Sequence, residues 1–213
     1  MKRRDFPLHL AGIGLALVTV GARAQGGPVE GRDYVKLGTP AAVGPLPAGK
    51  KVEVVEFFWY ECPHCHAFDP LLDSWVRKLP ADVAFRRVPV GFTARHVAAQ
   101  KMFYALENMG ALEGLHKKIF AAIHNQGARL VSESDIVAFV KANGVDGDKF
   151  TEQFRSFQVA TQSTKAKQLT DAYKIDGVPA LGIQGRFYTS GALAGSHERA
   201  LAVTEFLIQR ARA

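Results

Sequence analysis

The strongest indication of the fold is a run of β-branched and aromatic residues at positions 52–58, VEVVEFF. Such a run is typical of a strand that is buried on both faces of a sheet. Apolar residues then recur at three- and four-residue intervals from 63 to about 79, which predicts a helix, and the sequence VAFRRVP at 83–89 predicts a second strand. A strand, a helix and a strand in this order predict a βαβ unit with parallel strands.

The middle of the chain has a helical pattern throughout. The segments with this periodicity are 95–108, 112–125, 132–143 and 149–173, the last with a break expected near Phe157. Phe150, Phe154 and Phe157 lie at helical spacing, so we expect all three in the core of a helix bundle.

Strand-like sequence returns near the end of the chain. The segments 180–183 and 186–188 flank a Gln184-Gly185 turn and predict a hairpin, and an amphipathic helix is expected to follow. The whole pattern predicts an α/β fold with a central mixed sheet and an all-helical insertion. We expect its parts to be 25–92, the insertion 93–172, and 173–213.

The N-terminal segment has the three parts of an export signal. Basic residues at 2–4 precede an apolar stretch of 13 residues at 8–20, and Ala22-Arg23-Ala24 fits the small-x-small rule for cleavage. A membrane-spanning helix needs about 20 residues. We therefore expect 1–24 to be a cleaved signal peptide, with cleavage after Ala24, and an uncleaved anchor is the alternative.

Much of the positive charge lies in this leader. The formal net charge is +7 for the whole chain, and removing 1–24 takes away four basic residues and one acidic residue, which leaves +4. So small an excess argues against a nucleic-acid partner. The sequence RRDF at 3–6 loosely resembles a twin-arginine signal, although an ordinary basic region is the simpler interpretation.

Both cysteines of the chain lie in one tetrapeptide, Cys62-Pro63-His64-Cys65, after the buried strand and at the start of a helix. Two cysteines exclude a disulfide scaffold and a four-cysteine zinc site, and a bridge across so short a loop adds little stability. Pro63 fits the first helical turn, which places Cys62 near the N-cap. Free backbone N–H groups, the helix dipole and His64 should then stabilise a Cys62 thiolate, while Cys65 should be more buried.

Other interpretations of this cluster remain open. Cys62, His64, Cys65 and His66 are all potential metal ligands, although four ligands so close on one helix end cannot surround an ion tetrahedrally. An inert disulfide is a second alternative. The remaining histidines in helical segments are interpreted as structural: His96, His116, His124 and His197.

The segment 56–65, EFFWYECPHC, resembles the active site of DsbA-type thiol:disulfide oxidoreductases, which have a thioredoxin fold. A second motif, Gly177-Val178-Pro179-Ala180, is similar to the cis-proline loop that packs against the two cysteines in thioredoxin-fold proteins. The resemblance covers nearly the whole chain after the leader. It implies a cis Val178–Pro179 peptide bond.

The resemblance also implies roles for the residues already singled out. Cys62 is expected to be the nucleophile and Cys65 the resolving cysteine, while Val178 and Pro179 would shape a groove in which a substrate chain lies as an added strand. Glu56 matches the buried acidic residue behind the active site. A carboxyl in a central strand should have a raised pKa and could pass protons to or from Cys65. A glutamate held in a salt bridge at a strand end is the alternative.

Glu61 departs from the family pattern, because many relatives carry an apolar or aromatic residue before the first cysteine. Its charge should modestly oppose thiolate formation at Cys62. The resemblance nevertheless implies a periplasmic, monomeric dithiol oxidase without a cofactor beyond its own disulfide. That disulfide would be donated to newly exported, unfolded proteins and restored by a membrane partner of the quinone-coupled DsbB type. A disulfide isomerase or reductant, and a metal-binding or metallochaperone module, are the alternatives.

Overall fold

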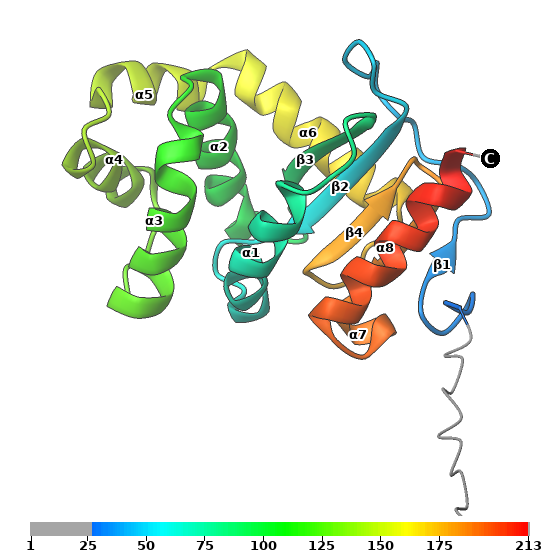
Figure 1. Ribbon diagram of the computed structural model, residues 1–213. Coiled ribbons are helices and arrows are strands. Elements are labelled where there is room, and N and C mark those ends of the chain that lie inside the picture. The colour runs from blue at the N-terminus through cyan, green and yellow to red at the C-terminus, as the bar shows by residue number, and fades with distance from the viewer. Residues whose placement is uncertain (1–26, 213) are drawn as a thin grey trace, which may run out of the picture.

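A five-stranded mixed sheet forms the centre of the protein, whose computed structural model describes residues 27–212 (Figure 1). The spatial order is β1-β5-β4-β2-β3, and β2 pairs with β3 in parallel while its other neighbour, β4, is antiparallel. The parallel pair is the one expected from the βαβ pattern. The strands are β1 (Val35–Lys36), β2 (Val52–Phe58), β3 (Val83–Pro89), β4 (Ala180–Ile183) and β5 (Phe187–Ser190).

Strand β2 is buried along its whole length because helices cover both faces of the sheet. Alternate residues point to opposite faces. Val52 and Val54 pack in a cluster with α1 (Pro63–Val76) and α8 (His197–Arg212). Val55 and Phe57 pack in a second cluster, beneath α6 (Phe157–Ala172). The expected strand and its two-sided burial are confirmed.

The β4–β5 hairpin turns at the two residues expected from the sequence. Gln184 and Gly185 both have positive φ, 49° and 64°, and Arg186 donates its N–H to the carbonyl of Ile183 at 2.9 Å. A side chain at Gly185 would lie 2.2 Å from the carbonyl oxygen of Ala41, so this position also requires glycine for space. The short helix α7 (Gly191–Ala194) then leads into α8.

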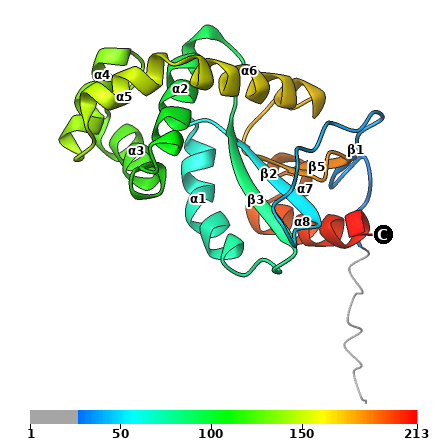
Figure 2. The ribbon, with the colours of Figure 1, turned by 90° about the horizontal axis from the view of Figure 1, so that it is seen from above.

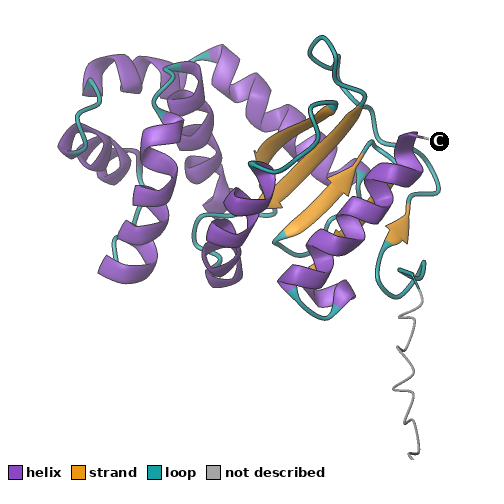
Figure 3. Cartoon of the chain, in the orientation of Figure 1, coloured by secondary structure: helices purple, strands orange, loops and turns teal. Residues whose placement is uncertain are grey.

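Helices gather at one end of the sheet, as the purple elements of Figure 3 show, and α6 leads from them back over the sheet (Figure 2). Ser132 caps α4 (Glu133–Ala142) as expected, with its Oγ accepting from the N–H of Asp135 at 3.1 Å. The division into an insertion at 93–172 and two flanking parts stays a prediction. The remaining helices of this group are α2 (Ala94–Asn108), α3 (Leu112–Gln126) and α5 (Gly147–Arg155).

The expectation of a continuous phenylalanine stripe is wrong at its last position. Phe150 and Phe154 are buried, but the side chain of Phe157 is 88% exposed. Ser156 leaves the helical conformation, with φ −66° and ψ 152°, and caps a new helix by accepting from the N–H of Val159. Because a new helix starts after this break, Phe157 no longer lies on the same helix face as Phe150 and Phe154.

The expected signal peptide 1–24, its cleavage point and Gln25 lie outside the described residues. Between residues 27 and 212, no helix has both the length and the apolar character needed to cross a membrane.

Candidate active site

Cys62 lies at the N-cap of α1, where the chain leaves β2. A turn from Trp59 to Cys62, closed by the Cys62 N–H donating to the Trp59 carbonyl at 3.1 Å, brings the chain to the helix. Cys62 has extended backbone angles, φ −80° and ψ 116°, and Pro63 occupies the first helical turn as expected. The N–H of Cys65 donates to Cys62 Sγ at 3.3 Å, and both cysteines are free thiols.

The pKa values of the two thiols are changed in opposite directions. The pKa of Cys62 is lowered to about 6, mainly because the Cys65 thiol donates to Cys62 Sγ. The backbone N–H groups of Cys65 and His64 and the His64 charge lower it further, whereas burial opposes the change. Burial raises the pKa of Cys65 far above its ordinary value, and its side chain is fully buried. The expected asymmetry, with a thiolate on Cys62 and a protonated Cys65, is what this geometry favours.

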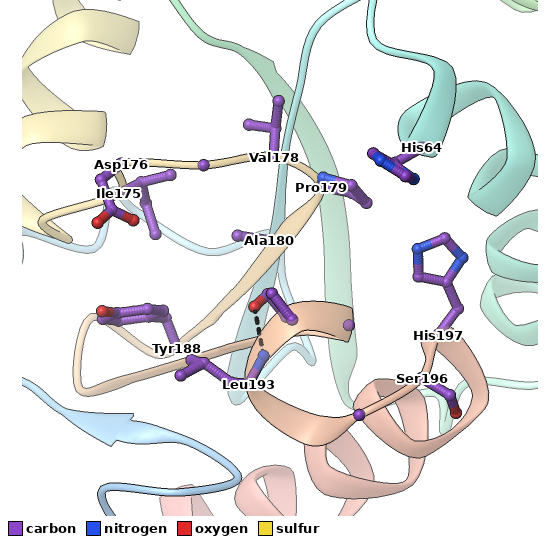
Figure 4. A pocket seen from close by; sticks show the side chains of 15 residues that line it. His64, Ile175, Asp176, Val178, Pro179, Ala180, Tyr188, Leu193, Ser196 and His197 are labelled. Carbon is purple, nitrogen blue, oxygen red and sulfur yellow. Dashed lines mark hydrogen bonds between the residues drawn. The ribbon is translucent and has the colours of Figure 1, made fainter.

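The loop before β4 closes over the first cysteine. The Val178–Pro179 peptide bond is cis, and the Val178 carbonyl oxygen lies 3.5 Å from Cys62 Sγ, which can donate to it only when the thiol is protonated. His64, Val178 and Pro179 line one cavity of about 620 Å³, which Figure 4 shows between α1, the loop and α7. Tyr188 and Leu193 form its opposite wall. The two motifs, 114 residues apart along the chain, therefore meet at one site.

Glu56 lies in the middle of β2 and is 2% exposed. Its register partner on β3 is Arg87, whose Nε donates to Glu56 Oε2 at 2.9 Å. Burial raises the pKa of Glu56 to about 7 in spite of the Arg87 charge. From the sequence, a raised pKa of Glu56 and a salt bridge of Glu56 at a strand end are alternatives. In the structure, Glu56 has both a raised pKa and a salt bridge, and it lies within β2 and not at its end.

Arg87, which the sequence patterns did not single out, pairs with Glu56 in this site. Its Nη2 also contacts Asp69 at 3.1 Å and Asp73 at 2.7 Å, so one guanidinium faces three carboxylates. Two signals were available: the arginine lies within a strand of apolar character, and Asp69 is four residues after Cys65, on the same helix face. The pairing itself depends on the β2–β3 register, which local sequence does not specify.

Glu61, the residue that departs from the family pattern, is paired. Arg95, in the first turn of α2, contacts its carboxylate through Nη2, and the Arg95 guanidinium also lies 5.8 Å from the centroid of the Trp59 ring. The Glu61 side chain is 17% exposed and that of Arg95 63%. The charge expected to oppose the thiolate thus has a counter-charge beside it.

The cysteines and histidines of the active-site segment are also the candidate metal ligands of the sequence. Across the part of the chain that the structure describes, no group of three or more His, Cys, Asp and Glu side chains is arranged to hold a metal ion. His66, one of the four candidates, stacks on the ring of His124 at a centroid distance of 4.7 Å.

The protein has a mixed sheet, and its cis-proline loop packs against a Cys-x-x-Cys pair whose first cysteine caps a helix. Together these features define a thioredoxin-fold thiol:disulfide oxidoreductase. A model of the DSBA-like thioredoxin domain matches residues 53–199. The thiol:disulfide interchange protein DsbA of Azotobacter vinelandii is 39% identical over 203 residues, covering 93% of this chain and 94% of that protein. DsbA of Bordetella pertussis is 38% identical over 218 residues, with full coverage of both.

Solved structures agree with these sequence matches. The crystal structure of Pseudomonas aeruginosa DsbA is 39% identical, with a TM-score of 0.80 over 85% of this chain and 93% of that one. DsbA from Xylella fastidiosa is 31% identical, with a TM-score of 0.80. The chain belongs to the DSBA-like thioredoxin domain family, and the predicted thioredoxin fold is confirmed.

Proposed function

We propose that this oxidoreductase works as a dithiol oxidase, in which Cys62 is the nucleophilic cysteine and Cys65 the resolving one. The observation that carries the proposal is the placement of the two thiols across the first turn of α1: Cys62 Sγ at the N-cap accepts from the N–H of Cys65, and the Cys65 side chain is fully buried. Stabilising the Cys62 thiolate stabilises the reduced form, and this makes the disulfide form a strong oxidant. A reductant would instead need the disulfide form to be the more stable of the two forms.

The reaction then has two exchange steps. A substrate thiolate attacks Cys62 Sγ, the Cys62–Cys65 bond breaks, and its electron pair leaves on Cys65, which takes up a proton. A second substrate thiol loses its proton and attacks the substrate sulfur of the mixed disulfide, so Cys62 leaves as a thiolate. The substrate loses two electrons and gains a disulfide, while the enzyme becomes the dithiol.

Glu56 is suited to supply the proton that Cys65 requires. It is buried, its charge contributes to the raised pKa of Cys65, and a pKa of about 7 lets it both donate and accept protons near neutral pH. Arg87 keeps the charged form accessible in a buried position. We therefore assign Glu56 the proton-transfer role and Arg87 the role of holding its charge.

The cavity beside Cys62 is the proposed substrate groove. Val178, Pro179 and His64 line it, and the Val178 carbonyl faces Cys62 Sγ, so an extended chain would have a backbone acceptor close to the reacting sulfur. Unfolded proteins with free cysteines fit this requirement because extended backbone is available in them. No bound cofactor is needed, since the electrons pass through the cysteine pair.

The cellular setting follows from the leader and the family. We propose that the protein is exported to the periplasm as a monomer, with 1–24 removed, and is reoxidised by a membrane partner of the quinone-coupled DsbB type. Mass spectrometry of the protein from a periplasmic fraction should give a chain beginning at Gln25. Membranes containing such a partner should restore the disulfide, whereas membranes lacking it should not.

A single-turnover assay tests the activity. The oxidised protein is mixed with a reduced, unfolded client that has two cysteines, and client disulfide should form as the enzyme dithiol appears, in equal amounts. Cys65→Ala cannot form the enzyme disulfide, so it should leave the client reduced under the same conditions. Efficient reshuffling of a scrambled client without net oxidation would favour the isomerase, and tight stoichiometric zinc binding that blocks thiol oxidation would favour the metal-binding module.

A further inference from the structure

One face of α3 lies against the turn that precedes Cys62. His116, Phe120 and His124 recur at four-residue intervals, so their side chains project from the same side of the helix. The ring centroids of His116 and Phe120 lie 5.3 Å and 5.0 Å from that of Tyr60, the second residue of the turn. A helix from the insertion therefore packs directly on the approach to the redox centre.

His116 joins the two ends of the active-site segment. Its Nε2 lies 3.2 Å from Asp69 Oδ1, and since a carboxylate only accepts, Nε2 carries the proton and donates. Burial lowers the pKa of His116 and raises that of the Tyr60 hydroxyl. The ring is therefore neutral, and its Nδ1 accepts from Tyr60 Oη at 2.8 Å. The link connects a residue two before Cys62 to a residue on α1.

His124 holds the same turn by its backbone. Its Nε2 lies 2.8 Å from the Tyr60 carbonyl oxygen, which can only accept, so the ring donates here. The His124 ring also stacks on His66, the residue after Cys65, with an interplanar angle of 6°. Two histidines of one helix thus contact the chain on both sides of the cysteine pair.

These contacts matter more to one redox state than to the other. In the disulfide form, the covalent bond itself fixes the two sulfurs. In the dithiol form, the turn and the N-cap conformation of Cys62 alone bring Sγ to the N–H of Cys65. Loosening the turn should therefore raise the free energy of the thiolate form more than that of the disulfide form.

We propose that His116 and His124 are positioning residues of the redox centre, which hold the turn at Tyr60 so that the Cys62 thiolate stays at the N-cap of α1. The insertion is in this way part of what makes the disulfide oxidising. The proposal rests on the oxidase function proposed above, because it concerns how strongly the dithiol form is favoured.

A matched pair of substitutions at His124 tests it. Phenylalanine keeps a ring against His66 but cannot donate to the Tyr60 carbonyl, whereas the side-chain amide of glutamine can donate from near the position of Nε2. His124→Phe should shift the equilibrium with glutathione toward the protein disulfide about fivefold, the effect of roughly one net hydrogen bond, and should raise the midpoint of thiolate absorbance. His124→Gln should stay within about twofold of wild type, and Tyr60→Phe, which removes only the hydroxyl bonded to His116, should shift as His124→Phe does.

Urea unfolding of both redox states separates positioning from simple stabilisation. If His124→Phe and Tyr60→Phe destabilise the oxidised and reduced proteins equally and leave the glutathione equilibrium and the thiolate midpoint at wild-type values, the proposal is overturned. Should His124→Phe fail to fold, Tyr60→Phe gives the same comparison. A wild-type thiolate midpoint near 8.5 would instead refute the oxidase function, whatever the variants do.

Discussion

The Cys62 thiolate should stabilise the reduced protein in a pH-dependent way, and Cys62→Ser should remove that dependence. The pKa of Cys62 is about 6 in the folded protein, against about 8.5 for an ordinary cysteine. Because the folded pKa is the lower one, the stabilisation is complete above pH 8.5, declines as the pH falls, and is lost below about pH 6.

The magnitude follows from the two pKa values. Each pKa unit corresponds to about 1.36 kcal/mol, so the unscreened contribution is about 3.4 kcal/mol above pH 8.5 and about 1.4 kcal/mol at pH 7. Solvent and salt screen a charge close to the surface, and we therefore expect about 1 kcal/mol at pH 7.

Urea unfolding of the reduced protein and of Cys62→Ser, between pH 5 and 8, measures this contribution. The difference in unfolding free energy between the two proteins should grow by about 1–2 kcal/mol from pH 5.5 to pH 8. The titration of Glu56 is common to both proteins and cancels in the difference. A difference that stays constant over this range would refute the thiolate argument, because no ionisation of Cys62 would then be linked to folding.

Three further predictions concern the charged groups around the cysteines. Glu56→Gln should fold but slow the exchange step at Cys65 and flatten its pH dependence around pH 7, as stopped-flow oxidation of a dithiol peptide would detect; unchanged rates would remove the proton-transfer role. Arg87→Leu leaves buried carboxylates without their counter-charge and should lower the unfolding free energy in urea by about 3–5 kcal/mol, and a loss below 1 kcal/mol would contradict the buried ion pairing. Arg95→Gln leaves the Glu61 charge near Cys62 unpaired and should raise the pH midpoint of the Cys62 thiolate absorbance, by an amount equivalent to about 0.2–1 kcal/mol. Added salt should suppress this rise, and a rise that does not depend on salt would exclude the electrostatic cause.

The elements of this protein follow from local sequence wherever a local rule applies. The run at 52–58 forms β2, and Ser132 begins α4. Pro63 places Cys62 at the N-cap, so the acidity of that thiol was already implicit in four consecutive residues. Caps, periodicity and turn residues act over a few positions, and these rules therefore need no knowledge of the rest of the chain.

The electrostatic surroundings of the cysteines depend on contacts between distant parts of the chain. The β2–β3 register sets Arg87 opposite Glu56, and the packing of α2 brings Arg95 to Glu61. Burial then sets how far each charge changes its neighbour's pKa. No periodic sequence pattern indicates these ion pairs, because each joins residues more than 30 positions apart.

The histidines of α3 illustrate the same division. In the sequence, His116 and His124 are two residues on one face of an ordinary helix. Their spacing does not indicate which part of the protein packs against that face. The fold brings this face to Tyr60 and so connects the insertion to the redox centre. Local sequence accounts for a reactive cysteine pair at a helix start. The contacts that hold and tune this pair came only from tertiary packing, since hydrogen bonds and charges act through distances in space and not along the chain.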